Sequence, residues 1–273
     1  KRSLPSLSPK PLSRWQKRHQ HARNEAPTGR VYLFNDEFTN YNDTDIGIKA
    51  ILLLTRLGYE VTLPRHTVSG RASFSKGLLR DAAKKASKNV QALRRVATEE
   101  TPLIGIEPSA ILSFRDEYPD IVPAALREDA NHLAKHSFMF EEFIAREIAA
   151  GRISADSFTD AGRKVLLHGH CQQKAVATTQ ATREALSLPQ NYKVEEIPSG
   201  CCGMAGSFGY EEEHYELSMQ IGELVLFPAV RAAAQSTLIA APGTSCRHQI
   251  KDGTKRTALH PVEVLYHALR SGE

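Results

Sequence analysis

Four cysteines are the residues whose type and spacing predict chemistry in this chain of 273 residues. Cys201 and Cys202 are adjacent, Cys171 stands upstream of them, and Cys246 stands downstream. Thiolates bind soft metals, and four of them equal the ligand set of a tetrahedral zinc site or of an iron–sulfur cluster. The pattern therefore predicts a single metal or cluster site that uses every cysteine of the chain.

The cysteines are expected to converge because each follows a predicted strand. These strands cover residues 165–167, 192–197 and 238–241, and each is followed by a loop that leads to a helix. In an open parallel sheet such loops gather at the carboxyl edge, and the helix N-termini favour thiolate over thiol. Adjacent cysteines bind one small ion poorly but can bind two irons of one cluster.

Strands and helices alternate along the whole chain, which predicts parallel βαβ units. In the first half we expect strands at 31–34, 59–63 and 102–106, with helices at 44–57 and from Ser75 through Val96. In the second half we expect helices at 172–186 and 212–226. The fold class is therefore α/β, with two pseudo-symmetric parallel-sheet halves and three layers.

The two halves can be aligned at their loops, which indicates an internal repeat. Where the second half carries cysteines, the first carries Val68, Ser69 and Ala110, and the counterpart of Cys171 falls in the region 35–39. The first half thus keeps the scaffold and lacks the sulfur ligands. The predicted layout, by residue range, is a basic Pro-rich linker or strap at 1–30, a repeat without cysteines at 31–123, a helical connector at 124–162 and a repeat with four cysteines at 163–273.

Composition narrows the classes of function. The formal net charge is +4, the chain is 41% apolar, and no apolar run is long enough to span a membrane. Neither nucleic acid nor a bilayer span is expected, and the polar N-terminus does not resemble a signal peptide. Few cysteines and no disulfide framework favour a cytoplasmic location, either free or peripheral at the inner face of the membrane. The start at Lys1 suggests a piece of a longer protein.

The cysteine segments resemble the cysteine-rich CCG domain, which is found in the B subunit of heterodisulfide reductase and in the iron–sulfur subunit of glycolate oxidase. The resemblance is strongest to the C-terminal part of FAD-linked oxidases of the D-lactate dehydrogenase type, and it covers about residues 31–270. The segments that carry it are His168–Cys171, Gly200–Gly209, Thr244–Arg247, His260-Pro261 and, in the first half, Ser69–Arg71, Ser75–Leu79, Glu107–Ala110 and Phe114–Pro119.

The resemblance implies tandem CCG repeats, of which one keeps its metal site, and a role in electron relay. A flavin part on another segment or chain would oxidise a 2-hydroxy acid such as lactate or glycolate, and electrons would pass through a 4Fe-4S-type cluster to a quinone or another carrier. The chain would then be part of an oxidoreductase rather than an enzyme by itself. It departs from the family at positions 243 and 249, which are Gly and Gln, so a five-cysteine cluster is not supported.

Two other interpretations remain open at this point. The cysteines could hold a zinc ion that only closes the fold and docks a partner. Alternatively, Cys201 and Cys202 could carry out thiol–disulfide chemistry, as in heterodisulfide reductase.

Four further residues are candidates for supporting the site. His168, His170, Arg247 and His248 flank the cysteines in sequence. They could donate hydrogen bonds to sulfur, offset its charge or supply a ligand or proton, while an ordinary loop histidine or surface ion pair is the simpler alternative.

Overall fold

The computed structural model describes residues 2–19 and 27–270. The chain divides into two compact units, Leu7–Phe143 and Ile144–Glu273, and the N-terminal residues through Ser6 belong to the second.

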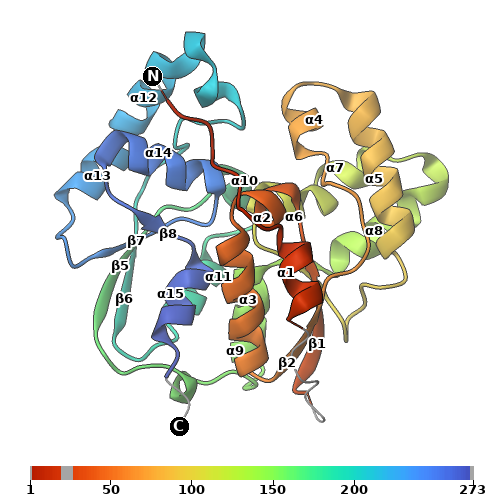
Figure 1. Cartoon of the computed structure of the whole chain (residues 1–273), viewed down its shortest axis with the longest axis horizontal. Helices are drawn as coiled ribbons and strands as arrows, with labels where there is room; N and C mark the ends of the chain where they lie inside the picture. The colour runs from red at the N-terminus through yellow and green to blue at the C-terminus, as the bar shows by residue number, and fades with distance from the viewer. Residues whose placement is uncertain (1, 20–26, 271–273) are drawn as a thin grey trace. The chain divides into compact units, whose positions relative to one another are not determined.

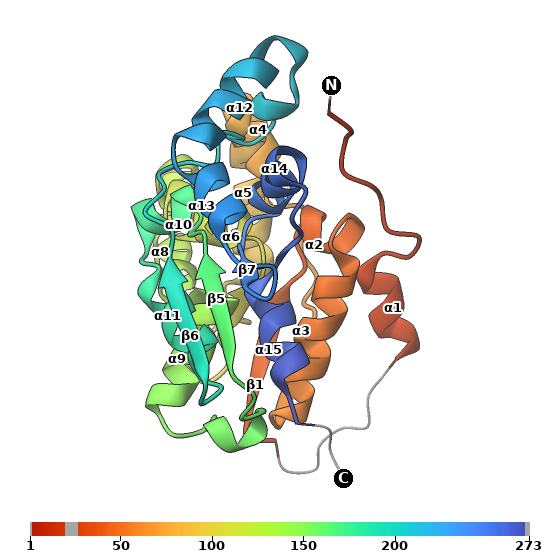
Figure 2. The same ribbon diagram turned by 90° about the vertical axis from the view of Figure 1, so that its left-hand side faces the viewer.

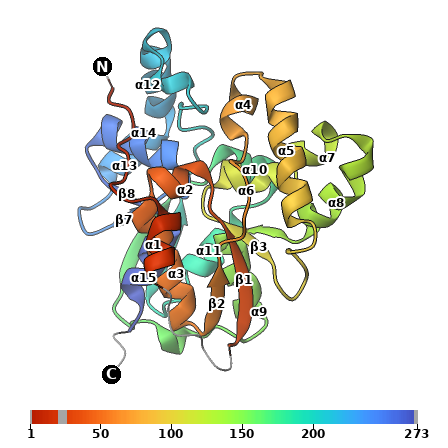
Figure 3. The ribbon, with the colours of Figure 1, turned by 45° about the vertical axis from the view of Figure 1, so that its right-hand side comes forward.

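The unit Leu7–Phe143 contains a four-stranded sheet in the order β2-β1-β3-β4, in which all neighbours are parallel. Figure 3 shows β1 and β2 side by side, with α3 running along them. Its strands are β1 Gly29–Phe34, β2 Tyr59–Thr62, β3 Leu103–Gly105 and β4 Ser137–Met139, and its helices are α1 Leu12–Arg18, α2 Glu37–Tyr41, α3 Thr44–Arg56, α4 Arg71–Ser75, α5 Leu79–Leu93, α6 Pro108–Ile111, α7 Glu117–Ile121 and α8 Arg127–Lys135.

The unit Ile144–Glu273 repeats this topology, with the parallel order β6-β5-β7-β8. Figure 2 shows β5 and β6 as neighbours that point the same way, and Figure 1 places α14 and α15 in this unit. Helix α9, Phe140–Ala149, spans the boundary; the strands are β5 Arg163–Leu167, β6 Tyr192–Glu196, β7 Leu238–Ala240 and β8 Ala258–Leu259, and the helices are α10 Cys171–Val176, α11 Gln180–Leu186, α12 Tyr215–Leu224, α13 Leu226–Ala232, α14 Thr244–Thr254 and α15 Pro261–Ala268.

Alternation along the strands makes the second unit three-layered. Val165 and Leu167 belong to a buried cluster with Leu186 of α11 and Val264 of α15. Leu166 faces the other way, into a cluster built around Phe227 of α13 and further residues of that face. Because side chains alternate across a strand, helices cover both faces of this sheet. The predicted α/β class with two pseudo-symmetric parallel halves is confirmed.

Several predicted elements need correction. Strand β4 lies in the stretch expected to be a helical connector, where three residues carry too little pattern to reveal a strand. Ser75 does not begin the long helix of the first half: it ends α4, and α5 begins at Leu79 after a turn in which the Leu78 amide donates to the Ser73 carbonyl at 2.9 Å. The helix expected at 172–186 is broken into α10 and α11, and the one at 212–226 begins as a 3-10 turn and is followed by α13.

Candidate metal centre

The cysteines lie where strand order reverses in the second sheet. The chain passes from β5 to β6 on one side, and β7 pairs with β5 on the other, with Val165 opposite Leu238. Ligands of open parallel sheets bind outside the carboxyl ends of the strands at such a switch point. The loop after β5 carries His168 and leads into Cys171, the loop after β6 carries the cysteine pair, and the turn after β7 leads to Cys246.

Helix starts place two of the sulfurs. Cys171 is the first residue of α10, whose N-cap is His170, and Cys246 is the third residue of α14, whose N-cap is Gly243. Exposed amide groups and the helix dipole make these positions favourable for a thiolate. Both cysteines therefore stand at helix starts as predicted, but only Cys246 has a lowered pKa, whereas hydrogen bonding to Cys201 raises that of Cys171.

The four sulfurs form one connected set. Hydrogen bonds between thiols link Cys171 with Cys201, Cys201 with Cys202, and Cys202 with Cys246. Cys202 and Cys246 are buried, Cys201 is half-buried and Cys171 is exposed. The set therefore runs from the interior of the unit to its surface.

Hydrogen bonds along this set lower the pKa of two cysteines and raise the pKa of the other two. Hydrogen bonds from Cys171 and Cys202 lower the pKa of Cys201, and the hydrogen bond from Cys202, followed by the nearby His168, lowers the pKa of Cys246. Donating to these thiolates raises the pKa of Cys171 and of Cys202. The four sulfurs therefore share protons as one group, and binding of a metal would displace those protons.

A compact nitrogen–sulfur group forms the buried end of the site. Nitrogen of the His168 ring and the Sγ atoms of Cys202 and Cys246 all lie within 4.8 Å of one another. His168 is fully buried, and its Nδ1 lies 2.7 Å from Oγ of Ser199. Sulfur and imidazole donors at this spacing suit zinc or iron, so the donor set fits the group that the sequence predicts.

A left-handed glycine shapes the loop of the cysteine pair. Gly203 has φ +97°, and a Cβ there would lie 2.3 Å from the carbonyl oxygen of Ser218. The Gly203 amide donates to Sγ of Cys201 at 3.3 Å. Only glycine allows this turn and this approach without strain, so it fixes the direction in which both sulfurs point.

Two residues that the sequence analysis did not predict hold the same loop. Lys174 of α10 donates from Nζ to the carbonyl of Gly200 at 3.3 Å and also to that of Ser199. Gln249 of α14 donates from Nε2 to the carbonyl of Cys202 at 2.9 Å. Their positions three residues after Cys171 and Cys246, one helical turn on, are the sequence signal that could have revealed them.

The N-terminal residues add a buried cation beside this loop. The side chain of Arg2 is 2% exposed, and its Nε lies 2.9 Å from Oδ2 of Asp252. Its guanidinium also contacts Met204 and Gln249, and lies 5.3 Å from the ring centre of Tyr215. The basic N-terminal segment thus provides a specific contact through Arg2, although sequence analysis treats it only as a linker or strap.

The other predicted supporting residues play backbone roles. His170 caps α10 by accepting from the amide of Gln172 at 3.3 Å. Arg247 is buried and donates to the carbonyls of Ala241 and Pro242 at 3.0 and 2.6 Å, so it holds the turn before α14 and is not a surface ion pair. His248 places Nδ1 2.6 Å from the hydroxyl of Tyr210.

The first half fills the equivalent site with oxygen and nitrogen groups. Glu37 is the first residue of α2, as Cys171 is of α10, and Gly70 repeats the left-handed turn of Gly203. The Glu37 carboxylate accepts from the amide and the hydroxyl of Ser69, both at 2.8 Å. Two of the positions that hold sulfur in the second half therefore hold a carboxylate and a hydroxyl that satisfy each other here.

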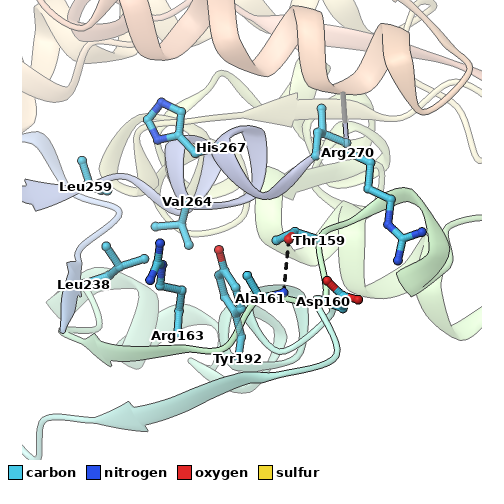
Figure 4. A pocket seen from close by; sticks show the side chains of 11 residues that line it. Thr159, Asp160, Ala161, Arg163, Tyr192, Leu238, Leu259, Val264, His267 and Arg270 are labelled. Carbon is cyan, nitrogen blue, oxygen red and sulfur yellow. Dashed lines mark hydrogen bonds between the residues drawn. The ribbon is translucent and has the colours of Figure 1, made fainter. Parts of the chain in front are cut away.

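A separate pocket lies at the opposite edge of the second sheet. It has a volume of about 580 Å³ and is lined at the starts of three strands by Arg163, Tyr192 and Leu238. Figure 4 shows these side chains around Val264, with the amide of Ala161 donating to Oγ1 of Thr159 at 3.2 Å. Because it opens at the amino ends of the strands, this pocket is not the site formed by the cysteines.

No helix in the described parts of the chain has the length and apolar character needed to cross a bilayer. No family model matches the sequence.

Comparison with characterised proteins reveals clear relatives. The chain is 31% identical to D-2-hydroxyglutarate dehydrogenase of Pantoea ananatis over 237 residues, which cover 86% of this chain and 22% of that protein. It is 28% identical to the C subunit of anaerobic glycerol-3-phosphate dehydrogenase of Escherichia coli over 98% of this chain and 66% of that protein. Lactate utilization protein A of Bacillus subtilis is 27% identical over 66% of this chain and 74% of that protein.

Over most of its length the chain is homologous to part of each of these proteins. The expected resemblance is thereby confirmed over most of the chain. The chain spans about a fifth of the length of the D-2-hydroxyglutarate dehydrogenases that it matches.

Proposed function

We propose that this chain is the electron-relay part of an FAD-linked 2-hydroxy acid dehydrogenase. Its centre is an iron–sulfur cluster held by Cys171, Cys201, Cys202 and Cys246. The observation that carries the proposal is that four sulfurs from three loops form one connected set at the switch point of a parallel sheet. An iron–sulfur cluster supplies one-electron chemistry when bound.

The residues of the chain hold and tune such a centre. Burial of Cys202 and Cys246 anchors its inner end away from water, while the exposed Cys171 leaves the outer end open to an electron partner. The Gly203 amide donates to sulfur, and hydrogen bonds to sulfur together with solvent exposure set the reduction potential. The gradient of burial therefore gives the site an entry side for electrons.

The partner would be a flavin-bearing segment or subunit. Two relatives support such a partner. One is D-2-hydroxyglutarate dehydrogenase, of which this chain matches only a small part. The other is named as a subunit of a dehydrogenase. The substrate would be a 2-hydroxy acid such as D-2-hydroxyglutarate, lactate or glycolate, and the acceptor a quinone or another carrier. We place this assembly in the cytoplasm or at the inner face of the membrane.

The first test is the metal itself. The full chain, purified without oxygen, is expected to be brown, to contain iron and acid-labile sulfide, and to give an electron paramagnetic resonance (EPR) signal when reduced. Cys202→Ser and Cys246→Ser should each lose most of the iron, because a buried serine is a poor ligand for it. Ser245→Ala, in the same turn of α14, is the control and should keep the iron.

A colourless chain that carries one zinc ion would contradict the proposal. It would favour the alternative in which a structural zinc closes the fold, because the same cysteines suit zinc.

A further inference from the structure

The histidine at the end of β5 has an unusual environment. His168 is fully buried, its Nε2 meets no oxygen or nitrogen partner in the parts of the chain that the structure describes, and its ring interacts instead with the Cys246 sulfur. Leaving a buried polar group poorly satisfied costs about 1–3 kcal/mol, so such an atom calls for a stronger partner. A nitrogen of this ring lies within 4.8 Å of the sulfurs of Cys202 and Cys246, which makes a bound metal the natural partner.

The other ring nitrogen is already held. Nδ1 lies 2.7 Å from the hydroxyl of Ser199. Ser199 is in turn fixed: its amide donates to the Ile197 carbonyl at 2.7 Å, and its own carbonyl accepts from Lys174. Histidines that bind metals usually donate the second ring N–H to a fixed acceptor, which sets the tautomer and aims the free nitrogen at the metal. His168 has this arrangement.

The donors also form a buried group and an exposed group, at the inner and outer ends of the site. His168, Cys202 and Cys246 form the inner end, with exposed fractions of 0%, 3% and 1%. Cys201 and Cys171 form the outer end, which reaches the surface. Gln249 lies one helical turn after Cys246, but its side chain is occupied by the carbonyls of Cys202 and Ser218 at 2.9 Å each, so it is not available as a donor.

We propose that His168 binds the metal centre directly through Nε2 and completes a set of five protein donors with the four cysteines. The inference rests on the proposed function in one respect, that the cysteines hold a metal or cluster. Ser199 holds the Nδ1 side of the ring, which leaves Nε2 as the atom that would bind the metal. Because the imidazole is a neutral donor, a centre with His168 as the fifth ligand carries less negative charge than one with a fifth thiolate, and its reduction potential is higher.

The test looks for nitrogen bound to the metal. The full chain is labelled with ¹⁵N-histidine, purified without oxygen, reduced and studied by pulsed EPR. We expect a nitrogen coupling strong enough for direct coordination in the parent protein, and its loss in His168→Gln. His168→Cys returns a thiolate and should bind iron without that coupling. Competition with a chelator should show metal binding weakened by at least the ~10–100-fold that the loss of a residue orienting a ligand costs.

His260→Asn is the matched control. His260 is equally buried, and its Nδ1 accepts from the amide of Val262 as the N-cap of α15, a role that asparagine can keep. This variant should retain the nitrogen coupling and the iron.

The outcomes separate the two proposals. Iron without a coordinating nitrogen in the parent protein would overturn the role of His168 and leave the electron-relay proposal standing, as would a coupling that persists in His168→Gln. If the chain binds zinc in place of iron, X-ray absorption counts nitrogen and sulfur neighbours: one nitrogen lost in His168→Gln supports the ligand although the relay fails. A chain that binds neither metal overturns both. His168→Cys is a second variant that should lose the nitrogen coupling, so a His168→Gln chain that does not fold leaves the test intact.

Discussion

Buried ionisable residues behave in opposite ways in the two halves. In the second half, neighbouring thiols and His168 stabilise thiolates at Cys201 and Cys246. In the first half, Asp36 is fully buried at the end of β1, and burial together with the nearby Glu37 raises its pKa to about 8. The carboxyl edge of the sheet therefore carries groups with lowered pKa in one half and a group with raised pKa in the other.

The pH dependence of stability should reveal Asp36. The folded unit holds a proton that the unfolded chain releases above the ordinary aspartate pKa of 3.8, so this contribution is complete below about pH 4 and is lost as pH rises to about 8. Asp36→Asn imitates the protonated form, since an amide can still accept from the amides of Phe38 and Thr39. The parent should lose up to about 1.4 kcal/mol of unfolding free energy per pH unit relative to this variant.

Urea unfolding between pH 5 and 9 measures this difference, and the single tryptophan, Trp15, reports from the same unit. Asp45→Asn, an equal change of charge on the exposed side of α3, is the control. Parallel curves for the parent and Asp36→Asn would show that Asp36 is ionised in the fold.

At the scale of elements, the loop after β2 and the loop after β6 contain the same left-handed glycine turn. Gly70 and Gly203 have φ +83° and +97°, and each precedes a segment that returns over the carboxyl edge. The turn needs no metal to form, because the first half keeps it with Val68 and Ser69 in place of the cysteines. The glycine determines the geometry of the turn, and the two residues before the glycine determine whether the loop can bind a metal.

Two glycines on either side of the cysteine pair give a matched test of this turn. Gly203→Ala forces a Cβ to 2.3 Å from the Ser218 carbonyl at a positive φ, and should destabilise the unit by about 1–3 kcal/mol. Gly200→Ala meets nothing within 4 Å and should change stability by no more than about 0.5 kcal/mol. Thermal unfolding of the two variants measures the difference. Equal effects would mean that the loop rearranges freely and that the left-handed turn does not position the cysteines.

At the scale of the whole molecule, the chain is a duplicated scaffold in which one copy carries the sulfur chemistry. Both sheets have the same strand order, and both place polar groups at the same switch point. Only the Ile144–Glu273 unit has the sulfur ligands, so metal binding should stabilise one unit and not the other.

Hydrogen exchange with and without the metal tests this asymmetry. Removal of the metal by a chelator should increase exchange in residues 168–176, 199–206 and 243–250, because the loops there lose the centre that links them. Exchange in the glutamate–serine site of Glu37 and Ser69 should stay the same, since hydrogen bonds close that site. Equal loss of protection in both units, or none in either, would contradict a centre confined to the second half.

The sequence by itself determined the α/β class, the internal repeat and the four cysteines, because hydrophobic period and residue type are local properties. It did not reveal β4, and it left His168 among several histidines of similar standing. Only the tertiary structure decided that Ser199 holds Nδ1 of His168 and that the His168 ring lies beside two buried sulfurs. It also decided that Arg2 and Gln249 support the cysteine loop. These contacts join residues that are between 31 and 247 positions apart in the sequence. Strand order and packing bring such residues together, and no local sequence pattern reveals them.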